Sequence, residues 1–231
     1  MLFDLRGRGR RRTVQAIYLS LAILMGGGLV LFGIGSDQSG GLVDAFTDDA
    51  QRGGDAAETV DKRIDAQLAK VRANPKDADA WAQLAIVRFQ RAGIDGVTQD
   101  GSYTEDGKRR LGLATDAWER HLALDPEEPN LRAANLMVQA YQGTGELDEA
   151  VRAKQLVTAA EDPPTSNLYQ QLAALAYQAG ETRVGDLAAA RAVDLAEPDQ
   201  RKELRDALRA YKTQVASQAA QNAATATTPA Q

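Results

Sequence analysis

The chain lacks cysteine altogether and has a single histidine among its 231 residues. The absence of cysteine excludes disulfides, thiolate metal sites and cysteine nucleophiles. One histidine leaves almost no room for a nucleophile paired with a histidine base. The motifs Gly-x-Ser-x-Gly, His-Glu-x-x-His and Gly-x-Gly-x-x-Gly do not occur either. We therefore expect no enzyme activity, no catalytic residue, no cofactor and no bound metal.

Positive charge is scarce outside the N-terminus. Residues 1–12 hold five Arg and one Asp, whereas residues 37–231 hold 22 Lys and Arg against 31 Asp and Glu. A nucleic-acid-binding domain needs a basic stripe on its folded part, because neutralised phosphates supply most of the affinity. The acidic body of this chain therefore argues against nucleic acid as a partner.

One long hydrophobic run breaks the polar composition. Residues 13–36 carry no formal charge, and residues 14–34 are mostly apolar. As a helix, those 21 positions would span about 31 Å, the thickness of a bilayer core. This length predicts a transmembrane helix at 13–36. A cleaved signal peptide stays open as an alternative, with Gly33-Ile34-Gly35 as its cleavage site, although its apolar region would normally be shorter.

The charges that flank the run predict an orientation. Five arginines precede it, and residues 37–56 carry five acidic residues and one arginine. The positive-inside rule then places residues 1–12 in the cytoplasm. Residues 37–54, rich in Gly, Ser and Asp, are expected to form a flexible linker. The remainder would lie outside the plasma membrane, on a single-pass anchor.

Helical periodicity begins after the linker. Apolar residues recur on one helix face at Val60, Ile64, Leu68 and Val71, and the pattern ends before Asn74-Pro75. In the next segment, ADAWAQLAIVRFQRAG at 78–93, Leu84 comes three residues after Trp81, and the small residue Ala85 follows it directly. The aromatic residue Phe89 comes one turn later. The segment ATDAWERHLALDP follows, in which Trp118 comes four residues after Ala114.

These two segments resemble the two helices of a tetratricopeptide repeat (TPR). A second unit at about 131–163 carries Tyr141 and the run Gly145-Glu146-Leu147-Asp148-Glu149-Ala150, and a third at about 166–198 carries Tyr169, Leu172, Ala173, Tyr177 and Gly180. Pro75, Pro126, Pro163 and Pro198 end the units, and the last interval between them is 35 residues, close to the 34-residue period of the family. Departures from the pattern occur at Arg88, His121, Ala134 and Gly185.

The resemblance implies an all-α fold, with an α-solenoid of about three TPR-like helix pairs at 55–215. An amphipathic helix marked by Leu204, Leu208, Tyr211 and Val215 would cap it. Residues 216–231 are low in complexity and are expected to be disordered. The opening MLFDLRGRGRRR is similar to that of actinobacterial single-pass membrane proteins with such repeats.

The first unit contains an insertion of about 17 residues, IDGVTQDGSYTEDGKRR. The spacing of Ser102 and Glu105 resembles a capping box, so we expect a loop at 93–103 and a helix from about Thr104. Gly101, Gly107 and Lys108 do not match a phosphate-binding loop, and the acidic residues of the insertion do not have calcium-loop spacing. A solvated loop or a partner contact remains open.

In TPR arrays the first helix of each pair lines a concave groove, so the resemblance implies a partner-binding face here. Its expected residues are mostly amide and aromatic: Phe89, Arg132, Asn135, Gln139, Gln142, Asn167, Gln170, Tyr177 and Gln178. Amides can pair with the backbone of an extended peptide. We expect a membrane-tethered scaffold or assembly module that captures a polypeptide outside the cytoplasm. The alternative is a chaperone-like maturation factor, of the cytochrome c assembly or secretion-associated type.

Overall fold

The computed structural model describes residues 53–226, and every regular element within them is helical. The helices are α3 (Gly53–Ala73), α4 (Ala78–Gly93), α5 (Glu105–Ala123), α6 (Leu131–Thr144), α7 (Leu147–Ala159), α8 (Ser166–Gln178), α9 (Thr182–Leu195) and α10 (Arg201–Ala226). The all-α prediction is thus confirmed for this part of the chain. None of these helices is both long and apolar enough to cross a bilayer. The predicted basic segment, membrane span and most of the linker lie outside the described residues.

Side-chain caps mark the start of four of the eight described helices. Asp77, Thr104, Asn130 and Thr165 each precede a helix and accept a hydrogen bond from a backbone N–H three residues later. Such caps satisfy one of the N–H groups that a helix start leaves without a partner. At the end of α6, Gly145 adopts a left-handed conformation with φ of 88°. A glycine takes this conformation without the penalty that a Cβ would impose, so the chain turns sharply into α7.

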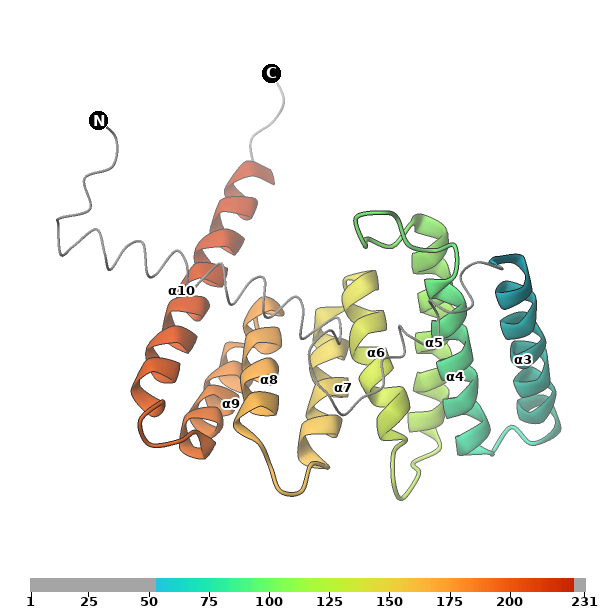
Figure 1. Cartoon of the computed structure of the whole chain (residues 1–231), viewed down its shortest axis with the longest axis horizontal. Helices are drawn as coiled ribbons and strands as arrows, with labels where there is room; N and C mark the ends of the chain where they lie inside the picture. Colours follow the sequence, from blue (N-terminus) through green and yellow to red (C-terminus); the bar gives the residue numbers. More distant parts are fainter. Residues whose placement is uncertain (1–52, 227–231) are drawn as a thin grey trace. The chain divides into compact units, whose positions relative to one another are not determined.

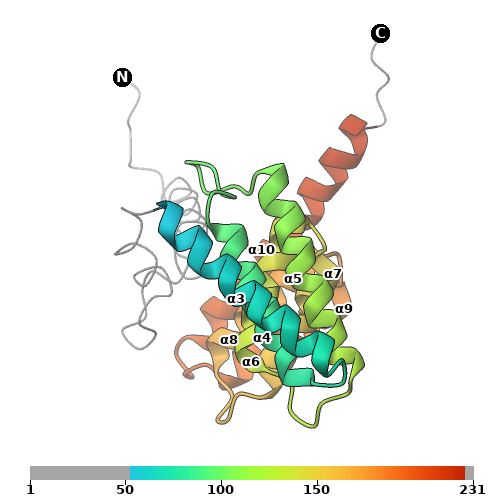
Figure 2. The same cartoon turned by 90° about the vertical axis from the view of Figure 1, so that its right-hand side faces the viewer.

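The helices form consecutive pairs that stack along the chain. α4 packs with α5, α6 with α7, and α8 with α9, and α10 packs on α8 and α9. Seen from the end of the array, α4, α6 and α8 lie in one layer and α5, α7 and α9 in the other (Figure 2). At the start, α3 contributes the buried side chains of Val60 and Val71 and an ion pair from Asp61 to Arg91, with 2.8 Å between Oδ1 and Nε.

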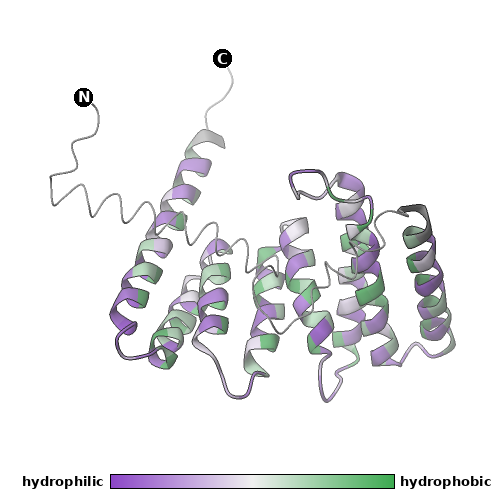
Figure 3. Ribbon diagram, viewed as in Figure 1, coloured by the Kyte–Doolittle hydropathy of each residue, from purple (hydrophilic) through white to green (hydrophobic). Residues whose placement is uncertain are grey.

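Small and large apolar residues alternate in the core between these layers. Ala85, Ala114 and Ala134 are fully buried and let neighbouring helices approach closely. Trp118 and Tyr141, at 1 % and 2 % exposure, fill the spaces between them. Hydrophobic and hydrophilic residues accordingly alternate along most of the helices (Figure 3). A single pair cannot bury such a face alone, so the stacking itself supplies the core.

The insertion between α4 and α5 folds into a small hairpin, although a loop was expected. Thr98 donates its N–H to the carbonyl of Ser102 at 2.8 Å, and Thr104 donates to the carbonyl of Gly96 at 2.9 Å. The isolated bridge between residues 97 and 103 joins its two sides. α5 begins at Glu105, as expected, but Thr104 is the cap; the expectation of a Ser102 cap is wrong, because the Ser102 hydroxyl donates to Asp100 instead.

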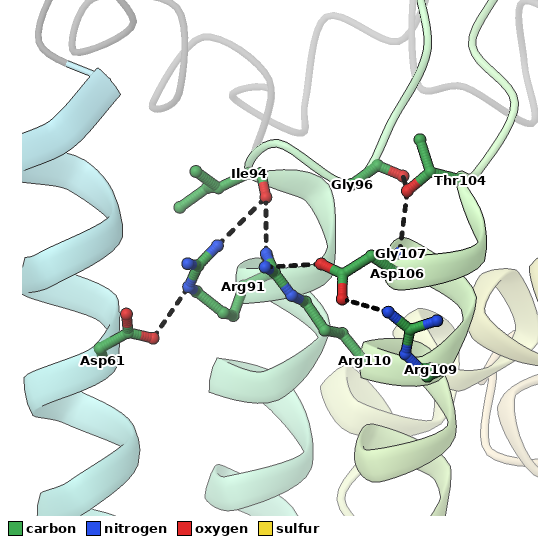
Figure 4. Close-up of polar contacts among 9 residues, drawn as sticks. All are labelled: Asp61, Arg91, Ile94, Gly96, Thr104, Asp106, Gly107, Arg109 and Arg110. Carbon is green, nitrogen blue, oxygen red and sulfur yellow. Dashed lines mark hydrogen bonds and ion pairs between the residues drawn. The ribbon is translucent and has the colours of Figure 1, made fainter.

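Two arginines hold the base of this hairpin (Figure 4). Arg110 on α5 donates to the carbonyl of Ile94 at 3.1 Å and pairs with Asp106 at 2.6 Å. Arg91 on α4 donates to the same carbonyl at 3.2 Å while its Nε pairs with Asp61. The end of α4, which would otherwise leave carbonyls without partners, is thereby satisfied by guanidinium groups from two helices.

The last helix is longer than the sequence pattern predicted. α10 continues to Ala226, beyond the expected end at residue 215. Its final part is rich in alanine, the residue with the highest helix propensity, and the loss of apolar periodicity there does not stop the helix. Low complexity was therefore a poor sign of disorder at 216–226.

Candidate functional site

The expected binding face is best developed on α6. Arg132, Asn135 and Gln139 are exposed and follow one another at spacings of three and four residues, so they lie on one side of the helix. Gln142, one turn further, is half-buried. The side chains of Asn135 and Gln139 make no hydrogen bond with any residue from 53 to 226. Their amide donors and acceptors are thus available to an incoming chain.

On α8 the expected residues are already engaged with their neighbours. Gln170 donates from Nε2 to the Ser166 hydroxyl at 3.0 Å, and Gln178 donates to the Tyr211 hydroxyl on α10. Asn167 is exposed and accepts from Nε2 of Gln171 at 2.9 Å. A ligand at α8 would therefore have to exchange existing hydrogen bonds, whereas at α6 it would only displace water.

The expected residues lie on helices of one layer, but only some of these helices have backbones in close contact. α4 packs directly against α6, and α8 packs against α10, but within the described chain no Cα atom of α6 comes within 8 Å of a Cα atom of α8. Phe89 on α4 is half-buried and packs on the core beside α6. The backbones of α4 and α6 are thus in close contact, whereas those of α6 and α8 are further apart.

Tyr177 does not lie on an accessible face. It is 6 % exposed, its ring packs against the backbone at Gly185 on α9, and its hydroxyl donates to Asp186 at 3.0 Å. Burial, together with the Asp186 carboxylate, raises the pKa of Tyr177 to about 12. The Lys212 ammonium lies 5.7 Å from the centre of the ring and pairs with Asp186 at 2.7 Å. This residue therefore joins α8, α9 and α10 and contributes no surface to a partner.

A buried lysine that was not among the expected site residues lies where α7 meets α8. Lys154 on α7 is 7 % exposed and donates from Nζ to Oε1 of Gln171 on α8 at 2.6 Å. Burial lowers the pKa of Lys154, and the carboxylate of Glu161 only partly opposes this effect. Lys154 stands four residues after Ala150, as Trp118 stands four residues after Ala114. That correspondence is a signal in the sequence that the lysine occupies a packing position.

The single histidine has a packing role. His121 is fully buried, stacks on Trp118 with 5.0 Å between ring centres, and lies 2.8 Å from the carbonyl of Ala78 through Nδ1. Its Nε2 accepts from the N–H of Asn130 at 3.2 Å. The ring thereby links α5 to the starts of α4 and α6. No group of metal-ligating side chains is present within residues 53–226.

Comparison with protein-family models and curated proteins adds nothing to this geometry. No protein-family model matches the chain. No curated protein matches it significantly. The functional assignment therefore rests on the exposed amide face of α6 and the buried Lys154.

Proposed function

We propose that the protein is a membrane-tethered interaction module that captures an extended polypeptide segment outside the cytoplasm on the amide face of α6. The observation that carries the proposal is the exposed run of Asn135 and Gln139, whose side-chain amides have no partner among residues 53–226. Each amide offers both a donor and an acceptor, as does each peptide group of an extended chain. Recognition of the backbone would then depend little on the sequence of the partner.

The stacked helix pairs support a TPR-like reading of the array. Three pairs, α4 with α5, α6 with α7 and α8 with α9, are preceded by α3 and followed by α10, which is the arrangement expected of an α-solenoid with its end helices. In such arrays the first helices of the pairs present the binding surface. α6 is one of these first helices, so its amide face has the position that a peptide ligand requires.

The proposed membrane anchor is supported by the length of the N-terminal apolar run and by the charges that flank it. A span of about 20 apolar residues with arginines on its N-terminal side inserts with that side in the cytoplasm. Protease added to intact cells should then digest the helical domain while an N-terminal tag stays protected. Protection of the helical domain would overturn the proposed location without bearing on capture.

Capture is tested by in-cell photo-crosslinking from position 132 of the full chain, on the same side of α6, followed by identification of the attached proteins. The double variant Asn135→Ala, Gln139→Ala should reduce recovery of the partner about tenfold, because two hydrogen bonds are lost at about 0.5–1.5 kcal/mol each. The matched control removes two exposed amides elsewhere, Gln155→Ala with Gln214→Ala, and should leave recovery unchanged.

The identity of the crosslinked proteins separates the two proposed roles. Recovery of one folded membrane or secreted protein supports a scaffold or assembly module. Recovery of many unfolded chains favours a chaperone-like maturation factor. Equal recovery with the double variant and its control would remove the α6 face from the proposal.

A further inference from the structure

The contact between α7 and α8 buries a cation that forms no ion pair within residues 53–226, and the Glu161 carboxylate acts on it only through its charge. None of the ion pairs among the described residues includes Lys154, and its ammonium is satisfied only by the neutral Gln171 amide oxygen. An ammonium has three donors and loses much of its hydration on burial, so one neutral acceptor leaves it poorly compensated. A carboxylate would be the better partner, because charge-assisted hydrogen bonds are about twice as strong as neutral ones.

A second polar group beside Lys154 also lacks a partner. Thr158 lies one turn further along the same face of α7, is 3 % exposed, and its hydroxyl makes no hydrogen bond. A buried hydroxyl without a partner is destabilising, and natural structures contain few of them. An ammonium and a hydroxyl separated by one helical turn can donate to the two oxygens of one carboxylate.

The route to this pair leads through exposed side chains. Gln171 covers the Lys154 ammonium, is half-buried, and donates its own amide to the exposed Asn167. Rotation of the Gln171 side chain would free Nζ of Lys154 from its acceptor without any movement of a helix.

We propose that Lys154 and Thr158 form a carboxylate-binding site between α7 and α8, which anchors the captured polypeptide by an acidic group. The carboxylate replaces the oxygen of Gln171 as the acceptor from Nζ and takes a second hydrogen bond from the Thr158 hydroxyl. The inference rests on the proposed function, because the ligand is a group of the segment captured beside α6. The carboxylate site gives the protein a preference for acidic segments, whereas the α6 amides recognise only the peptide backbone.

The carboxylate can come from a chain terminus or from an Asp or Glu side chain, and three probes separate these sources. They are octapeptides of one Ala/Ser sequence with an N-terminal dye that has no carboxylate. The first ends in a carboxamide, the second in a free carboxylate, and the third ends in a carboxamide but has one central Ser replaced by Asp. Binding to the full chain in a non-ionic detergent is followed by fluorescence anisotropy.

At least one carboxylate probe should bind about 10- to 100-fold more tightly than the carboxamide, as expected for a hydrogen bond to a charged group. Lys154→Met should abolish this preference and leave binding of the carboxamide unchanged. Thr158→Val, which keeps the shape of the side chain, should reduce the preference several-fold. Lys202→Met removes an exposed lysine and serves as the control for the loss of one positive charge; circular dichroism verifies that each variant is folded.

Equal affinity for all three probes would overturn the carboxylate site and leave backbone capture standing. An equal loss of preference in Lys154→Met and Lys202→Met would also overturn it, because a general charge effect would then explain the result. If none of the probes binds, both the site and the capture of extended chains fail. Retention of the preference in Thr158→Val together with its loss in Lys154→Met supports the lysine as the anchor.

Discussion

The ring of Tyr177 lies directly against the backbone of Gly185. A Cβ at position 185 would come within 2.4 Å of Cε1 of the tyrosine. The ring has little freedom to move, because it is 6 % exposed and its hydroxyl is bonded to Asp186. The missing side chain on α9 thus makes room for an aromatic residue on α8, and the small position in this repeat has to be glycine.

Gly185→Ala should lower the free energy of unfolding by about 1–2 kcal/mol. Overpacking of a core typically costs about 1–3 kcal/mol, and the better helix propensity of alanine returns up to about 1 kcal/mol. Gly112→Ala is the matched control, since it is also in a helix interior but a Cβ there meets nothing within 4 Å. The control should raise stability by about 0.5–1 kcal/mol. Urea denaturation measures both, and a stabilised Gly185→Ala protein would contradict the packing argument.

The same tyrosine predicts a loss of stability at high pH. The pKa of Tyr177 is about 12 in the folded chain and about 10 when unfolded. Between these values the folded state holds the proton that the unfolded state releases, so stability falls as pH rises from about 10 to 12 and is unaffected below that range. Tyr177→Phe should remove this part of the fall, and should cost about 1 kcal/mol at neutral pH for the lost hydrogen bond to Asp186.

Urea denaturation at several pH values, with ultraviolet absorbance to follow tyrosinate formation, checks this prediction. Tyr169→Phe is the control, because the Tyr169 hydroxyl has no hydrogen-bond partner among residues 53–226. Tyr141 also titrates late, because burial and then the nearby Glu119 raise its pKa. Burial also raises the pKa of Tyr103, so the absorbance curve of Tyr177→Phe should still contain the late titrations of Tyr103 and Tyr141. A pH profile of stability that is the same in the wild type and Tyr177→Phe would contradict the assignment.

Local patterns in the sequence predicted the helices and much of the core. The apolar periodicity and the flanking Asn74-Pro75 and Gly93 define α4 closely, because caps and breakers act over a few residues. Trp118 was expected in a seam and is buried there with His121 stacked on it. These successes depend on short-range chemistry, which a single sequence displays directly.

The predictions that were wrong or missing depend on contacts between residues far apart in the sequence. The sequence placed Tyr177 on the binding face because it could not show that Gly185, on the next helix, leaves a space for the ring. It missed Lys154 because a lysine is rarely buried, and only the match with Trp118 in the preceding unit pointed to a seam position. The wider spacing between the backbones of α6 and α8 depends on how whole helices pack, which no local pattern encodes.

The hairpin in the insertion also depends on a contact between two glycines. A Cβ at Gly107 would lie 2.1 Å from the carbonyl oxygen of Gly96, and the same oxygen accepts the N–H of Thr104 that closes the hairpin. Alanine at position 107 would force that carbonyl away and break the closing bond. Helix α5 itself should persist, since alanine is a better helix former than glycine.

Gly107→Ala should therefore open the hairpin while the helical array stays folded. Thermolysin cleavage at Val97 and chymotrypsin cleavage at Tyr103, followed bond by bond with mass spectrometry, should accelerate about tenfold or more, because local opening exposes the backbone to the protease. Gly112→Ala, on the same helix with open space around its Cβ, should leave both rates unchanged. Cleavage in Gly107→Ala at the wild-type rate would mean that the two glycines do not hold the hairpin closed, and its order would then have to come from the bonds of Arg91 and Arg110 to Ile94.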